Sequence, residues 1–99
     1  METTVQHFPL IEKEQITDLH FGHEDVWPDK ESQKRRTAEL DRAARLGNAY
    51  HGKVELTFQI ANGDILRVQT TIWQVDPEYV TLKSGVTIPL QAVLGVEFF

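Results

Sequence analysis

Two histidines and two carboxylates near the N-terminus are the residues best suited to binding a metal ion. His20 and His23 are followed directly by Glu24 and Asp25, and imidazole and carboxylate groups both bind zinc and similar divalent ions. A glycine between the histidines indicates a turn, whereas a structural site needs its ligands on a rigid element. A metal-responsive protein using His20 and His23 is therefore the second alternative function, and no cofactor is otherwise predicted.

A basic run supplies the chemistry for binding a nucleic acid backbone. Lys34, Arg35 and Arg36 are consecutive, and lysine or arginine side chains on one helix can replace the counterions of phosphates. The chain as a whole is acidic, however, with a net charge of −5, and strongly basic domains are the usual nucleic-acid binders. Nucleic-acid binding through these three residues is the first alternative, and a solvated helix face is the simpler interpretation.

The residues needed for nucleophilic catalysis are scarce. There are no cysteines, and the serines are Ser32 and Ser84, neither of which lies beside a histidine and a carboxylate in the sequence. No pair of carboxylates frames a predicted cleft. We therefore predict a protein that is not an enzyme.

Aromatic residues near a predicted turn are the candidates for contact with a protein partner. Trp73 and Tyr79 flank Asp76-Pro77, a pair whose residue types are typical of a turn. Large aromatic side chains beside loops often carry binding energy, although Trp73 could instead close the end of the core. Phe99 at the C-terminus has the parity of an outward-facing residue and is a third candidate.

A basic amphipathic helix is predicted over residues 30–47. Asp29 or Ser32 can cap its first turn, and Gly47-Asn48 has the residue types of a helix end. Leu40 and the small apolar residues around it form a narrow stripe, so one side of this helix should lie on the rest of the protein.

Residues 48–99 carry the alternation of short antiparallel strands. Apolar side chains occupy every second position from Val54 to Ile60, and Asn62-Gly63 predicts a tight type I′ hairpin turn. The buried face must change near Thr70-Thr71, which indicates a bend or β-bulge. Three further runs predict a strand over 79–83, a brief strand over 86–88 and a last strand over 94–98, with one helical turn over 90–92. We predict a mainly β fold in which five antiparallel strands close into a small barrel filled by its own side chains.

This succession of elements resembles the Src-homology-three-like and Sm-like small barrels, and it is similar to short bacterial proteins of unassigned function. The resemblance covers about half of the chain, and the predicted helix directly before the first strand also occurs in Sm proteins. Ile72, Val75 and Asp76 match the register of the Sm nucleotide-binding loop. Thr70 stands where that family has a glycine, and Val80 stands where it has a base-contacting asparagine. The resemblance therefore implies the fold rather than RNA binding.

Charge divides the chain into three parts within a single domain. Residues 1–29 carry a net charge of −6, residues 30–49 carry +3, and residues 50–99 carry −2. We interpret residues 1–29 as an acidic docking arm, which lies either on its own barrel or on that of a neighbour. We favour its own barrel, because about 50 residues bury little area alone.

These patterns together predict a cytoplasmic, non-enzymatic protein interaction or assembly module. The sequence shows neither the pattern of a signal peptide nor an apolar run that could span a membrane, so no membrane partner is predicted. A protein partner or self-association is expected, because open strand edges favour pairing between copies and hence a homo-oligomer.

Overall fold

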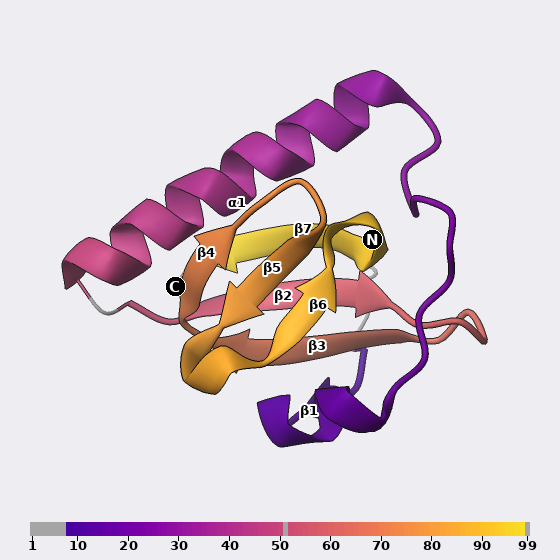
Figure 1. Cartoon of the computed structure of the whole chain (residues 1–99), viewed down its shortest axis with the longest axis horizontal. Helices are drawn as coiled ribbons and strands as arrows, with labels where there is room; N and C mark the ends of the chain where they lie inside the picture. Colours follow the sequence, from indigo (N-terminus) through magenta and orange to yellow (C-terminus); the bar gives the residue numbers. More distant parts are fainter. Residues whose placement is uncertain (1–7, 51, 99) are drawn as a thin grey trace, which may run out of the picture.

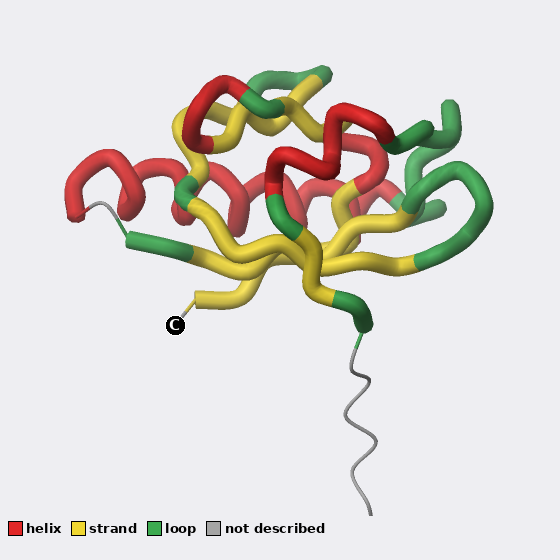
Figure 2. The backbone as a smooth tube through the Cα atoms, turned by 90° about the horizontal axis from the view of Figure 1, so that it is seen from below, coloured by secondary structure: helices red, strands yellow, loops and turns green. Residues whose placement is uncertain are grey.

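The computed structural model describes residues 8–50 and 52–98, with the backbone alone for 48–50. The fold of this part is mixed α/β: a helix and a smaller sheet lie on the same side of a larger sheet (Figures 1 and 2). The larger sheet has the strand order β1-β3-β2-β7 and the smaller sheet has the order β4-β5-β6. The strands are β1 (Leu10–Ile11), β2 (Val54–Gln59), β3 (Ile65–Thr70), β4 (Ile72–Val75), β5 (Tyr79–Leu82), β6 (Thr87–Pro89) and β7 (Val93–Phe98). The α-helix α1 spans Lys30–Tyr50, and the 3₁₀ helices are η1 (Lys13–Asp18), η2 (Lys83–Gly85) and η3 (Leu90–Ala92).

The predicted closed five-stranded barrel is wrong for the residues that the structure describes. They form seven strands in two sheets, and the added edge strand β1 comes from the N-terminal arm and pairs in parallel with β3. No ladder between described strands joins β6 to β7, where Pro89 and η3 intervene. Proline has no N–H to donate to a ladder. The alternation of side chains identified the strands, but it carries no information on which of their edges pair.

The change of buried face near Thr70-Thr71 is confirmed as the point where one sheet gives way to the other. β3 ends at Thr70, and β4 begins at Ile72 in the smaller sheet. Thr70, Thr71 and Ile72 are all buried, which a straight strand with alternating faces does not allow. The backbone therefore bends at this point and carries β4 toward α1.

The β2–β3 hairpin has a wider loop than predicted. The two strands pair from Val54 with Thr70 to Gln59 with Ile65. In the loop, the Gly63 N–H donates to the Ile60 carbonyl over 2.9 Å. The backbone angle φ is +97° at Gly63, whereas at Asn62 it is not positive. A type I′ turn needs positive φ at both central residues. The predicted two-residue turn is therefore wrong, and a longer loop with one left-handed glycine takes its place.

Helix α1 begins as predicted but ends later. Asp29 caps it, since its Oδ2 accepts the N–H of Ser32 over 2.9 Å. The helix continues through Gly47 to Tyr50, so the predicted end at Gly47-Asn48 is wrong. A Cβ at Gly47 would lie 3.0 Å from the carbonyl oxygen of Ile72. The glycine therefore lets α1 approach the start of β4 closely.

One apolar core lies between the larger sheet and the layer formed by α1 and the smaller sheet. Phe58, Leu56, Leu40 and Ile88 are among its fully buried side chains, and Ile16 from the N-terminal arm joins them. The arm is also tied to the chain by the backbone: the Val26 N–H donates to the Gln91 carbonyl over 2.9 Å. Residues 8–29 thus pack against the sheets of the same chain.

Candidate functional site

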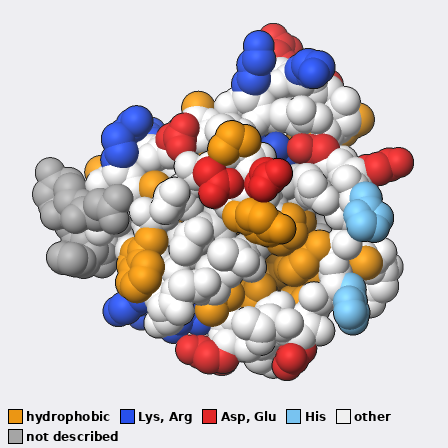
Figure 3. Space-filling view, viewed as in Figure 1, with side chains coloured by type: hydrophobic (Ala, Val, Ile, Leu, Met, Phe, Trp, Pro, Cys, Tyr) orange, Lys and Arg blue, Asp and Glu red, His pale blue; other side chains and the backbone are white. Residues whose placement is uncertain are grey.

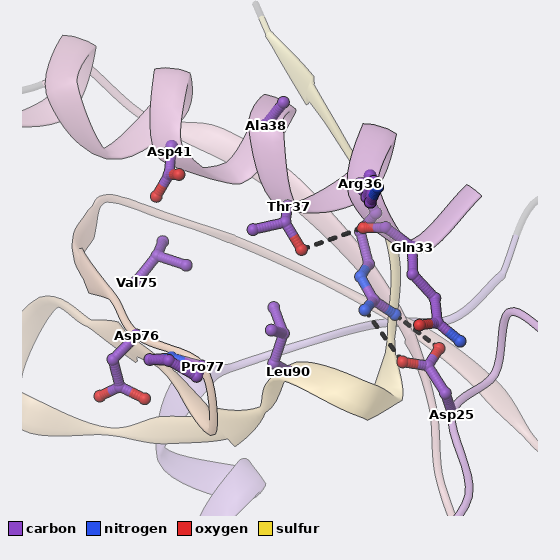
Figure 4. Close-up of a pocket in the computed structure, with 11 residues that line it drawn as sticks. Asp25, Gln33, Arg36, Thr37, Ala38, Asp41, Val75, Asp76, Pro77 and Leu90 are labelled. Carbon is purple, nitrogen blue, oxygen red and sulfur yellow. Dashed lines mark hydrogen bonds and ion pairs between the residues drawn. The ribbon is translucent and has the colours of Figure 1, made fainter. Parts of the chain in front are cut away.

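A groove lies between α1 and the β4–β5 turn. We call it the α1–turn groove; it encloses about 690 Å³, within the usual range of roughly 300–1,000 Å³ for ligand sites. Figure 4 shows α1 as one wall and the β4–β5 turn as the other, with Leu90 between them. Its lining residues are Asp25, Gln33, Lys34, Arg36, Thr37, Ala38, Asp41, Val75, Asp76, Pro77 and Leu90.

The turn that forms the lower wall is held rigid by its own hydrogen bonds. Asp76 Oδ1 accepts the N–H of Glu78 over 2.8 Å and the N–H of Tyr79 over 2.7 Å. The Glu78 carbonyl accepts the N–H of Leu90 over 2.9 Å, which links the turn to the floor. Such a wall is preformed, so a ligand would lose little free energy in ordering it.

A buried ion pair closes one end of the groove. Arg36 donates from its two terminal nitrogens to the two carboxylate oxygens of Asp25, over 2.7 and 2.9 Å, and from one of them to the Val93 carbonyl over 3.3 Å. The Arg36 side chain is only 3% exposed and that of Asp25 is 22% exposed. Figure 4 shows Arg36 descending from α1 to meet Asp25 at this end.

The Nε–H of Arg36 is the one buried side-chain nitrogen or oxygen group in the described part that lacks a hydrogen-bond partner. Buried donors are nearly always paired, with protein, water or a ligand. Arg36 lines the groove, and its Nε–H stays unpaired among the described residues.

Around the ion pair, the N-terminal arm is fastened to α1 and β7. Asp25 Oδ1 also accepts the N–H of Trp27 over 2.8 Å, and the indole Nε1–H of Trp27 donates to the Leu94 carbonyl over 2.8 Å. Gln33 on α1 donates from its side chain to the Trp27 carbonyl over 2.8 Å. We call this set, Asp25, Trp27, Gln33 and Arg36, the clasp.

Charged side chains on the rim of the groove have no ion partner within the described residues. Asp41 and Lys34 are exposed on α1, and neither is in an ion pair there. Asp76 uses Oδ1 for the turn, which leaves Oδ2 available. The rim thus offers two carboxylates and one ammonium group around an apolar floor that includes Val75 and Leu90.

A second hollow lies on the other side of Pro77. We call it the Tyr79 hollow; it encloses about 340 Å³ and shares Pro77 with the α1–turn groove. Its lining residues are Phe21, Gly22, His23, Pro77, Glu78, Tyr79, Pro89 and Gln91. The space-filling view in Figure 3 shows this face of the molecule, with acidic side chains gathered beside an apolar, hollowed region.

The predicted basic run is divided by the structure. Arg36 points inward and is occupied by Asp25, Lys34 lies on the groove rim, and Arg35 is exposed with a long contact of 3.4 Å to Ser32 Oγ. The three residues therefore do not form one basic surface. Arg36 is thus removed from the predicted contact with a nucleic acid, whereas Lys34 and Arg35 stay exposed, so binding through this run stays a prediction.

The two histidines remain at the surface. His20 and His23 are exposed, and no group of three or more histidine or carboxylate side chains in the described residues could hold a metal ion. Asp25, which the sequence placed beside them, faces Arg36 instead. Among the residues that the structure describes, the histidine pair thus has no third ligand.

Trp73 and Tyr79, the aromatic residues predicted to contact a partner, lie at different places on the β4–β5 hairpin. Trp73 and Tyr79 are 47% and 45% exposed, but Trp73 lies at a bulge in the middle of the hairpin, whereas Tyr79 begins β5 beside the turn. Tyr79 lines the second hollow and Trp73 lines neither hollow. Phe99 lies outside the described residues. Of the residues named from the sequence, Tyr79 lines the Tyr79 hollow, and Lys34 and Arg36 line the α1–turn groove, whereas Thr37, Ala38 and Asp41 on α1 were not singled out.

The outer face of the larger sheet carries a polar network. Glu55 accepts hydrogen bonds from Arg67 and from Gln69, each over 3.0 Å, and Arg67 also donates to the Phe8 carbonyl over 2.7 Å. The hydrogen bond from Gln69, followed by that from Arg67, holds the pKa of Glu55 below its ordinary value. This network ties the arm to β3 and β2, so its role is structural.

A comparison of the chain with models of protein families, with characterised proteins and with solved structures finds no match. The resemblance to Sm-like barrels is therefore neither supported nor removed by a relative. In the described residues, no helix is long and apolar enough to cross a membrane.

Proposed function

We propose that the protein is a non-enzymatic interaction module that binds a short, extended segment of a partner protein in the α1–turn groove. The groove is the observation that carries the proposal. Its size and its apolar floor between charged rim residues support a preformed binding site. We keep the cytoplasm as the expected compartment, since a chain without cysteines needs no oxidising environment to fold.

The charges on the rim favour a partner segment that carries basic and apolar side chains. Asp25 and Arg36 neutralise each other. The remaining charges on the rim are the two carboxylates of Asp41 and Asp76 and the single ammonium group of Lys34, so the rim is negative. The protein as a whole carries a net charge of −5, which attracts a basic partner over a longer range. An apolar side chain would fill the floor between Val75 and Leu90.

Binding of labelled synthetic peptides, followed by fluorescence anisotropy, tests the proposal. One set places a leucine two residues from a lysine, and a charge-reversed set carries glutamate in place of the lysine. We expect saturable binding of the first set and much weaker binding of the second. Equal binding of the two sets, or none at all, contradicts the proposal.

Two tryptophan variants locate the binding. Ala38 lies exposed on α1 and lines the groove, so Ala38→Trp should fill it and weaken peptide binding by about tenfold or more. Glu31→Trp places the same side chain on α1 at an exposed position that lines neither the groove nor the Tyr79 hollow. Peptide affinity that is lost equally in both variants would show that the groove is not the site.

A further inference from the structure

The Tyr79 hollow has the chemistry of a site for a cationic side chain. Tyr79 is 45% exposed, so its ring is available to a ligand, and Glu78, which is also exposed, lines the same hollow. No lysine or arginine lines the hollow, and Glu78 is in no ion pair among the described residues. The hollow therefore offers an aromatic face and a carboxylate, with His23 as the only basic residue in its lining.

The walls of the hollow are held in place from three directions. The Tyr79 backbone is fixed by Asp76 Oδ1, and Tyr79 pairs with Pro89 across the smaller sheet. Phe21 packs against the buried ring of Phe58, with 6.1 Å between the ring centroids. Gln91 donates from its side chain to the Gly22 carbonyl over 2.6 Å, which fixes the arm at the edge. A ligand would thus meet a formed surface rather than a loose one.

We propose that the Tyr79 hollow is the subsite for a lysine or arginine side chain of the same partner segment that occupies the α1–turn groove. The cation would lie over the ring of Tyr79, where the face of an aromatic ring attracts positive charge, and it would pair with Glu78. This inference rests on the proposed function, because it needs a segment already held in the groove.

The two hollows are placed so that one extended segment can reach both. Pro77 belongs to the wall of each. In an extended chain, side chains two residues apart lie on the same side, about 6.6 Å from each other. A segment crossing Pro77 can therefore place an apolar side chain in the groove and the basic side chain two residues away in the Tyr79 hollow.

Two peptides that differ in one charge test the inference. One carries leucine and, two residues away, lysine; the other carries norleucine in place of the lysine, which keeps the four-carbon stem and removes the ammonium group. We expect the wild-type protein to bind the lysine peptide about fivefold more tightly, from an exposed cation–π contact and one surface ion pair.

Three variants assign that preference to the hollow. Glu78→Gln and Tyr79→Leu should each bring the affinity ratio of the two peptides toward one, while the matched carboxylate change Glu24→Gln, outside the hollow, should leave it unchanged. Circular dichroism of each variant checks that the fold is retained, and Glu78→Gln keeps the backbone bonds of the turn.

The outcomes separate this inference from the proposed function. The Tyr79 subsite is overturned if the wild-type affinities for the lysine and norleucine peptides agree within about twofold while Ala38→Trp still weakens the binding of both. The groove then remains the binding site. Binding that Ala38→Trp does not weaken overturns the groove and the subsite together. A lysine preference that survives both Glu78→Gln and Tyr79→Leu also overturns the subsite, because the cation then lies elsewhere.

Discussion

Replacing Asp25 by alanine should lower the free energy of unfolding by about 3 kcal/mol. The change leaves the Arg36 guanidinium, whose side chain is only 3% exposed, with one carbonyl at 3.3 Å as its partner. Removing one member of a buried pair costs roughly 3–5 kcal/mol. We take the lower end of that range, because the Asp25 side chain is 22% exposed and water can enter where it was. For a domain of this size the melting temperature should fall by roughly 12–24 °C.

Urea unfolding measures this change, with the fluorescence of Trp27 and Trp73 and the circular dichroism of α1 as independent signals. Arg36→Met removes the buried charge and keeps an apolar stem, so the double variant Asp25→Ala with Arg36→Met should be more stable than Asp25→Ala alone. Glu24→Ala, an exposed neighbouring carboxylate, should stay within about 0.5 kcal/mol of wild type. A loss of less than about 1 kcal/mol for Asp25→Ala, or a lower stability of the double variant than of Asp25→Ala, would show that Asp25 and Arg36 do not form a stabilising buried pair.

Three further changes test other parts of the structure. Gly47→Ala should destabilise by about 1–2 kcal/mol, although alanine is the better helix former, because its Cβ would lie 3.0 Å from the Ile72 carbonyl oxygen; a raised melting temperature would contradict the close packing. Trp27→Phe keeps a ring but leaves the Leu94 carbonyl without its donor, so urea unfolding should show a loss of about 1 kcal/mol, and wild-type stability would argue against the clasp. The pKa of Glu55 is lowered from 4.5 in the folded protein, so its contribution to stability is complete above that value and is lost as the pH falls through the folded pKa. Unfolding midpoints measured across this acid range should therefore fall less steeply for Glu55→Gln than for wild type, and parallel curves would contradict the assignment.

The strands could be predicted from the sequence because burial on one face leaves a direct period of two. Val54, Leu56 and Phe58 alternate with less apolar residues, and all three are buried in β2. The bend at Thr71 was predictable for the same reason, since the apolar positions change parity there. The helix was equally accessible, because its stripe around Leu40 and its cap at Asp29 are local features.

The arrangement of the sheets could not be predicted, because it depends on contacts between distant segments. The strand β1 has two residues and no period, so nothing in the sequence marked it as the edge of the larger sheet. Gly47 has the residue type of a helix end, but its role depends on how close Ile72 lies. Closure of a barrel would have required β6 and β7 to pair, which no local pattern decides.

Only part of the candidate site could be predicted from the sequence, because the rest depends on contacts between distant segments. The Asp76-Pro77 turn and Tyr79 have local signatures, and both line hollows on this face. Arg36 stood in a run of three bases, and nothing in that run distinguished the buried residue from the two exposed ones. The Asp25–Arg36 pair closes one end of the groove, and that pairing joins residues from different elements.

Backbone amide shifts in a nitrogen–proton correlation spectrum, recorded while the leucine–lysine peptide is added to the intact protein, test the central claim most directly. If the peptide binds in the α1–turn groove, the largest shifts should fall on Ala38, Val75 and Leu90, which line the groove from three elements. Shifts confined to the outer face of the larger sheet, around Glu55 and Arg67, would contradict it, as would a spectrum that the peptide leaves unchanged.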